Sequence, residues 1–197
     1  MSHKTIEESI EDTLQAVFLL AGGKDKFIGI AEAEAHEIAR KWDLNIDTIG
    51  RILRSHLFVE HHLTEHLQRV NPKLGPLLTA KLSYTQKVEL IDRGDKFLAE
   101  LVPGLRRIGA IRNRLAHQLD AAIKPEDVTV FLQNLIFVAM RTERFRPDPP
   151  PDDPLLVLEE FSQHAASWLH ATYSKVGALM RSAGVGIPEE RAAKKDA

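Results

Sequence analysis

The segment Arg112-Asn113-Arg114-Leu115-Ala116-His117 holds the side chains of this sequence that are best suited to acid–base chemistry. The imidazole of His117 accepts and donates a proton near neutral pH. Arg112, five residues earlier, carries a permanent positive charge that suits phosphate binding. An imidazole close to a guanidinium can transfer protons beside a bound anion. The segment is therefore a candidate site for acid–base chemistry on an anionic ligand.

Arg112 occupies a position where the helical pattern calls for an apolar residue. Apolar residues step by three and four through this part of the chain: Leu98, Leu101, Leu105, Ile108, Leu115 and Leu119. Because an unpaired guanidinium is costly to bury, Arg112 should either meet a carboxylate or open onto an anion-binding pocket. Glu60 interrupts the apolar stripe of an earlier helix in the same way. One alternative is therefore a buried Glu60–Arg112 ion pair, and the other is a Glu60 that reaches water at the edge of its stripe.

The R-x4-H spacing from Arg112 to His117, with the polar Asn113 after the arginine, resembles the shared motif of the HEPN superfamily. The resemblance covers roughly residues 45–144. It implies an up-and-down bundle of four or five helices that forms a homodimer. In active members of the superfamily it also implies a metal-independent ribonuclease, whereas other members are binding or regulatory modules. A further subset resembles bacterial sugar-operon repressors.

Under the ribonuclease interpretation, His117 acts as general base or acid and Arg112 stabilises the charge that gathers on the phosphate. Asn113 orients His117 or a phosphate oxygen. On a straight helix Arg112 points about 140° away from His117. Either the helix deforms near His117, or the long arginine side chain wraps round the helix, or two subunits pool their motifs across a two-fold axis. The last alternative is what the resemblance implies, with the two copies facing each other in one cleft. Arg106 and Arg114 would add positive charge there, and RNA would be the substrate because DNA lacks the 2′-hydroxyl.

Under the non-catalytic interpretation, Arg112 is only the ion-pair partner of Glu60, and His117 only stabilises the end of its helix. The protein is then a helical regulator or interaction module. Some HEPN toxins are silenced by an antitoxin that modifies a tyrosine two positions after the motif histidine. Leu119 stands at that position here, so this form of control is not expected. The expected partners are a second copy, RNA, and an antitoxin or regulatory protein.

Composition limits the remaining classes of function. A length of 197 residues suits one domain with appended helices, and a net charge of −2 requires any RNA binding to come from a local basic patch. The absence of cysteine excludes disulfides and thiolate metal sites. No signal peptide or membrane-length apolar run is visible, so we expect a cytoplasmic protein. No nucleotide-binding loop motif occurs, and no cofactor is expected.

A metal pair is the remaining chemical candidate. His62 and His66 are spaced i, i+4 with Glu65 between them, as helical metal ligands are. The spacing is not H-E-x-x-H, and the sequence indicates no third ligand. We therefore predict no metal site.

The periodicity predicts an all-α protein, organised as a HEPN-type up-and-down bundle with appended helices. The predicted helices are 5–20, 27–42, about 47–70, 83–93, a motif helix that begins near Pro103, 124–144 and 155–182. The predicted parts are N-terminal helices packed on the bundle (1–44), the bundle (45–146), a Pro/Asp-rich spacer (147–154), a C-terminal helix (155–183) and a disordered tail (184–197). The C-terminal helix cannot be stable alone, so it should dock either on its own bundle or on a neighbouring subunit, and we expect its own bundle.

Overall fold

The computed structural model describes residues 6–43, 46–73, 75–118 and 122–182, and within them it contains helices and no strand. The predicted all-α class is confirmed. The helices are α1 (Ile6–Ala21), α2 (Lys24–Trp42), α3 (Ile46–Val70), α4 (Tyr84–Glu89), α5 (Lys96–His117), α6 (Pro125–Leu132), α7 (Leu135–Phe145), α8 (Pro154–Ala171) and α9 (Lys175–Ser182). None of the described helices is both long and apolar enough to cross a membrane. The predicted tail, 184–197, lies outside the described residues.

The chain divides into two compact units, Met1–Asn45 and Ile46–Ala197. In the first unit, α1 and α2 meet at the rings of Phe18 and Phe27, whose centroids are 5.4 Å apart. Gly22 and Gly23 connect the two helices with φ angles of 80° and 123°, a conformation that glycine adopts without a steric penalty. The predicted packing of these helices on the bundle stays a prediction.

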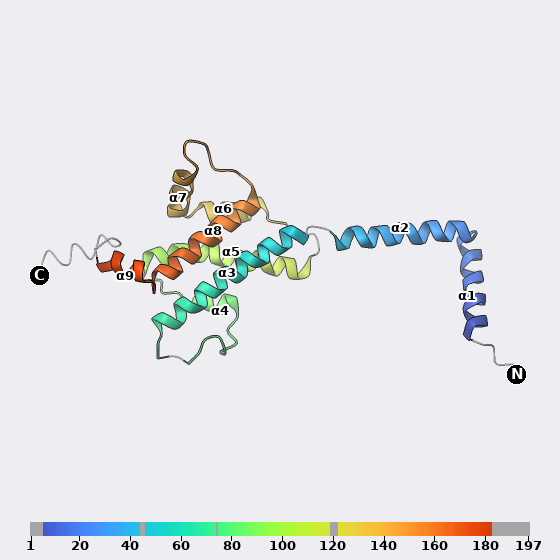
Figure 1. Ribbon diagram of the computed structural model, residues 1–197, viewed down its shortest axis with the longest axis horizontal. Coiled ribbons are helices and arrows are strands. Elements are labelled where there is room, and N and C mark those ends of the chain that lie inside the picture. The colour runs from blue at the N-terminus through green and yellow to red at the C-terminus, as the bar shows by residue number, and fades with distance from the viewer. Residues whose placement is uncertain (1–5, 44–45, 74, 119–121, 183–197) are drawn as a thin grey trace, which may run out of the picture. The chain divides into compact units, whose positions relative to one another are not determined.

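In the second unit, α3 and α8 run parallel and lie side by side (Figure 1). Arg51 pairs with Glu159 near the start of both helices, at 2.6 Å. His66 bonds the Thr172 hydroxyl at 2.7 Å near their ends. The helix that follows the spacer therefore docks within its own unit, as we expected.

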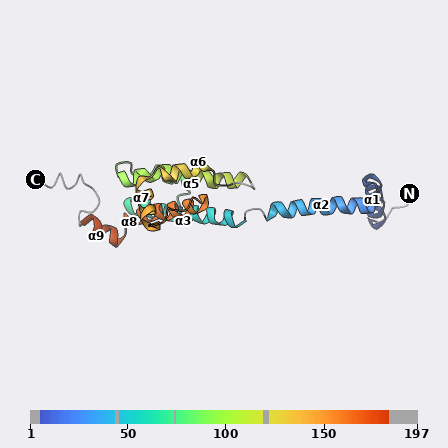
Figure 2. The ribbon, with the colours of Figure 1, turned by 90° about the horizontal axis from the view of Figure 1, so that it is seen from above.

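The second unit has two layers, with α5 and α6 in one layer and α3 and α8 in the other (Figure 2). α5 runs antiparallel to α8, since Phe97 stacks on Trp168 with ring centroids 5.0 Å apart and Gly104 lies against Phe161. A Cβ added at Gly104 would lie 2.1 Å from Cζ of Phe161. The absence of a side chain at Gly104 therefore allows the two layers to approach closely. The largest fully buried side chains are Phe131, Phe161, Ile52, Leu63, Leu67, Leu101, Leu105, Ile108, Ile111, Leu158, Leu169 and Val59.

Two helix starts follow from capping residues. The prediction that the motif helix begins near Pro103 is wrong, because α5 begins at Lys96. The Asp95 carboxylate caps it by accepting hydrogen bonds from the backbone N–H groups of Phe97 and Leu98. Pro103 lies inside the helix, where it lacks an N–H donor. The predicted Ser83 cap of α4 is confirmed, although α4 ends at Glu89 instead of residue 93.

Two segments predicted as single helices are each broken into two. Asn134 separates α6 from α7, because its side chain caps α7 by accepting from the Phe137 N–H and donates to the Glu100 carbonyl. Residues 172–174 separate α8 from α9. A Cβ added at Gly177 would lie 1.7 Å from the Ala171 carbonyl oxygen, so the start of α9 turns back closely on the end of α8.

Candidate functional site

The motif residues Arg112, Asn113 and His117 are exposed side chains in the last turns of α5, which ends at His117. Arg112 Nη1 donates a hydrogen bond to Asn113 Oδ1 at 3.3 Å. Asn113 and His117 are four residues apart and share one face of the helix. Within the described residues no hydrogen bond joins Arg112 to His117. One copy of the chain thus brings Arg112 to Asn113 but not to His117.

Arg112 does not lie in the buried stripe of α5, and that prediction is wrong. The buried surface of α5 is wider than the predicted stripe, since it also includes Val102, Gly109 and Ile111. Ile111 is the last buried residue of the helix, and the residues that follow it are half-buried or exposed. Burial ends before Arg112, so its guanidinium reaches water without a desolvation cost.

Glu60 does not pair with Arg112, so the predicted ion pair is also wrong. The partner of Glu60 is Lys87, which the short α4 places against α3 with Nζ 2.7 Å from Oε1. Glu60 Oε2 lies 3.8 Å from Nδ1 of His56. Among the described residues, no carboxylate lies within ion-pair distance of Arg112.

The pKa of His56 is affected by the charge of Arg112. Its ring is buried, and the centroid lies 4.4 Å from that of Tyr84, whose hydroxyl donates to the Leu105 carbonyl. Burial lowers the pKa of His56; the Glu60 carboxylate opposes the shift, and the charges of Arg112 and Lys87 add to it. Arg112 is therefore close enough to His56 to disfavour the charged form of its ring.

The other arginines of α5 are held by carboxylates. Arg106 binds Glu89 through two hydrogen bonds of 2.8 Å. Arg114 and Arg107 both bind the carboxylate of Asp127, which is 1% exposed. Arg106 and Arg114, expected to support phosphate binding, are thus engaged in ion pairs within the chain.

Asp127 and His164 are two buried ionisable residues that the sequence did not predict as site residues. Asp127 lies at the third position of α6, where its carboxylate accepts from the Lys124 N–H at 2.8 Å, and this capping pattern was visible in the sequence. His164 is buried in α8 and its Nε2 has no hydrogen-bond partner in the described part of the chain. Burial lowers the pKa of His164 to about 4, so its ring is neutral at physiological pH. No sequence signal marked it.

The histidine pair of α3 joins this helix by hydrogen bonds to the residues that directly follow α8. His62 bonds the Tyr173 hydroxyl at 3.3 Å, and His66 bonds Thr172 at 2.7 Å. In the ranges that the structure describes, no three histidine, cysteine or acidic side chains are grouped so that they could hold a metal ion. Burial lowers the pKa of both histidines.

Comparison of the chain with protein-family models, with curated proteins and with solved structures gave no match. The functional argument therefore rests on the motif residues and on their surroundings in α5.

Proposed function

We propose that the protein is a metal-independent endoribonuclease of HEPN type, whose active site combines Arg112, Asn113 and His117 from two copies of the chain. In this proposal the protein is a toxin or defence effector. Its substrate is RNA, and an antitoxin or regulatory protein restrains it.

The observation that supports the proposal is the free guanidinium of Arg112. Arg106, Arg107 and Arg114 of the same helix each bind a carboxylate. Arg112 has only the amide oxygen of Asn113 among the described residues. The non-catalytic interpretation needed Arg112 as the partner of Glu60, and Lys87 fills that role. An exposed cation without a structural partner is available to bind a phosphate.

The angle between Arg112 and His117 argues for a paired site. The two residues are five positions apart, so their side chains leave a straight helix about 140° from each other. Two motifs related by a two-fold axis place the Arg112 of one copy near the His117 of the other. Such a site uses the free guanidinium of each copy and needs no change in the helix.

The proposed reaction is a transesterification within the RNA strand. His117 removes the proton of a ribose 2′-hydroxyl, whose oxygen attacks the neighbouring phosphorus. The bond from phosphorus to the 5′-oxygen breaks, and that oxygen takes up a proton from the protonated His117, which returns to its neutral form. Arg112 stabilises the extra negative charge on the phosphorane. The products are a 2′,3′-cyclic phosphate and a 5′-hydroxyl.

The test is cleavage of labelled RNA in the presence of EDTA by the wild-type protein, His117→Ala and Arg112→Ala. We expect each variant to lose roughly 100-fold or more in rate. His61→Ala, an exposed histidine of α3, is the matched control and should cleave like the wild type. A substrate with a deoxyribose at the cleaved position should resist. Equal cleavage by wild type and His117→Ala would contradict the proposal.

Mixing the two inactive variants tests the paired site. A dimer of one Arg112→Ala copy and one His117→Ala copy retains one site with both groups intact. We expect the mixture to recover part of the activity that each variant lacks alone. A mixture that forms mixed dimers and stays inactive would argue against a site shared between copies.

The apolar surface of the first unit favours a second candidate function, a helical regulator or interaction module without catalysis. Leu19, Leu20 and Trp42 are each at least 80% exposed, and α2 has no buried residue. The two helices leave these side chains uncovered by packing on each other, and exposed apolar side chains of this size favour contact with a partner surface. A regulator should be tolerated when expressed alone and should keep its function in His117→Ala, whereas a toxin should impair growth and lose that effect.

A further inference from the structure

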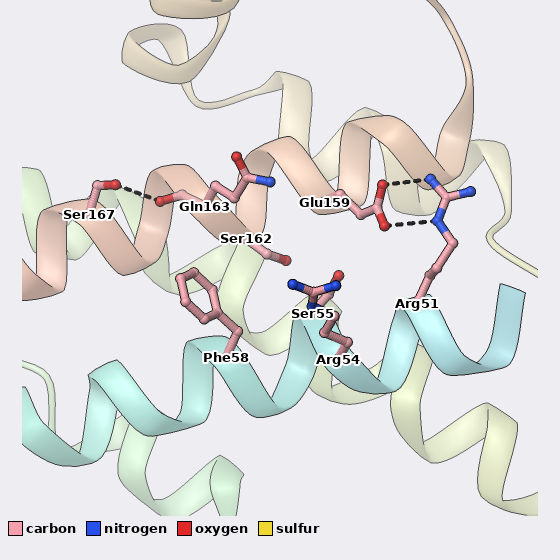
Figure 3. A pocket seen from close by; sticks show the side chains of 8 residues that line it. All are labelled: Arg51, Arg54, Ser55, Phe58, Glu159, Ser162, Gln163 and Ser167. Carbon is pink, nitrogen blue, oxygen red and sulfur yellow. Dashed lines mark hydrogen bonds and ion pairs between the residues drawn. The ribbon is translucent and has the colours of Figure 1, made fainter. Parts of the chain in front are cut away.

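A groove of about 710 Å³ lies between α3 and α8 (Figure 3). This volume is in the range of small-molecule sites. Arg51, Arg54, Ser55 and Phe58 line it from α3, and Glu159, Ser162, Gln163 and Ser167 line it from α8. Every one of these residues belongs to the second unit, and none belongs to the motif in α5.

Two uncharged polar side chains in this groove, those of Ser55 and Gln163, lack a partner in the described part of the chain. Ser55 is only 7% exposed, yet no described residue hydrogen-bonds its hydroxyl. The amide of Gln163 on the opposite helix is likewise unbonded there, although the Gln163 backbone carbonyl accepts from Ser167. Ser55 is thus a largely buried residue that lines the groove and whose hydroxyl has no protein partner among the described residues, so this hydroxyl is available to bond a ligand atom.

The charge of the groove favours an anion. Arg51 holds both oxygens of Glu159, at 2.9 and 2.6 Å, so the acidic residue of the groove is neutralised. The guanidinium of Arg54 has no ion-pair partner among the described residues. Figure 3 shows Arg54 extending from α3 toward the groove, close to Ser55 in that view. A free guanidinium is suited to a carboxylate or a phosphate, which it binds with two parallel hydrogen bonds.

Phe58 favours a flat ring in the same ligand. It lies one turn after Arg54 on α3, is 44% exposed and points toward α8 (Figure 3). The ring of His62 meets it edge-on, with centroids 4.9 Å apart and an angle of 81°, and stabilises its orientation. A planar ligand stacking on this exposed ring would bury apolar surface that the chain leaves open.

We infer that the groove between α3 and α8 binds a small aromatic oxyanion, a flat ring that carries a carboxylate or a phosphate. Arg54 and the Ser55 hydroxyl bind the acid group, and Phe58 stacks on the ring. The Gln163 amide bonds polar atoms at the ring edge. This inference does not rest on the proposed ribonuclease, because it uses other helices and its test measures binding instead of cleavage.

Calorimetric titration of the full chain with four probes tests the inference. The probes are phenyl phosphate, benzoate, inorganic phosphate and benzyl alcohol. Binding of phenyl phosphate or benzoate that exceeds the binding of inorganic phosphate and benzyl alcohol supports the site, and the tighter of the two identifies the acid group. No binding of either ring-bearing anion at millimolar concentration would overturn it.

Variants separate this site from general attraction to surface charge. Arg54→Gln should weaken binding roughly 10- to 100-fold, and Phe58→Leu roughly three- to tenfold. Arg69→Gln removes an exposed arginine of the same helix outside the groove and should bind like the wild type. Equal losses in Arg54→Gln and Arg69→Gln would overturn the inference. All three variants alter exposed side chains, so circular dichroism should show the wild-type fold.

Discussion

Lys87 Nζ lies 2.7 Å from Glu60 Oε1, and this ion pair joins the short helix α4 to the middle of α3. Lys87 thus takes the place that one of the two alternatives drawn from the sequence gave to Arg112. The Glu60 and Lys87 side chains are 25% and 12% exposed, so the pair is partly shielded from solvent. The free state of Arg112 is thus a consequence of where α4 docks.

A double-mutant cycle tests this assignment. We expect the Glu60→Ala and Lys87→Ala changes to couple by about 0.5–1 kcal/mol in the free energy of unfolding. Glu60→Ala and Arg112→Ala should be additive within about 0.3 kcal/mol, since these side chains form no pair. Urea unfolding of the single and double variants provides the numbers. Stronger coupling of Glu60 to Arg112 than to Lys87 would contradict the structure.

Arg114 and Arg112 should differ sharply in their effects on stability. Arg114→Met removes one of two cations from the buried carboxylate of Asp127, and we expect a loss of about 2–3 kcal/mol in the free energy of unfolding. Arg112→Met should change it by less than about 0.5 kcal/mol, because it breaks no ion pair. The midpoints of urea denaturation check both values. Similar losses for the two variants would show that Arg112 has a structural partner.

His164 should make stability depend on pH. Its folded pKa of about 4 is below its ordinary value of 6.5, so only the unfolded chain binds the proton between these values. Above about pH 6.5 the ring is neutral in both states, so its titration costs no stability. As the pH falls toward 4, protonation of His164 in the unfolded chain lowers the free energy of unfolding. From pH 7 to pH 5 the wild type should lose about 1–2 kcal/mol more than His164→Leu. Parallel pH profiles for the two proteins would refute the role of His164.

Two glycines should respond in opposite directions to alanine. Gly104→Ala places a methyl group within 2.1 Å of the Phe161 ring, so we expect a loss of about 1–3 kcal/mol. Gly50 lies in α3 with no atom within 4 Å of an added Cβ, and Gly50→Ala should gain up to about 1 kcal/mol from helix propensity. Thermal unfolding measures both. A stabilising Gly104→Ala would mean that the α5 and α8 layers are farther apart than the structure has them.

The sequence predicted elements whose ends have local signals. The extent of α3 followed from periodicity and from the Asn71-Pro72 stop, and the cap of α4 from Ser83. The breaks at Asn134 and after Ala171 were missed because their causes are contacts with distant elements. The Asn134 amide reaches a carbonyl of α5, and Thr172 meets His66 of α3.

The candidate site was proposed from the types and spacing of Arg112, Asn113 and His117, and its chemical role stays a prediction. The ion pairs of the surrounding arginines could not be predicted from the sequence. Which carboxylate meets which arginine depends on the docking of α4 and α6, and Glu60 and Asp127 each had several arginines within plausible reach. The groove between α3 and α8 could not be predicted, because it requires the parallel arrangement of two helices that are about a hundred residues apart in sequence.

The Asp127 carboxylate affects the end of α5 although no hydrogen bond among the described residues joins it to Arg112, Asn113 or His117. Arg114, three residues before His117, bonds both this carboxylate and the carbonyl oxygen of Ala122. These bonds hold Ala122 and Asp127 against the last turns of α5. They lower the conformational entropy of the end of α5 in the unbound protein, so that a ligand bound at the motif would order fewer side chains. A change at Asp127 would loosen the end of α5, and in the proposed ribonuclease it would lower the rate of cleavage with every motif residue intact.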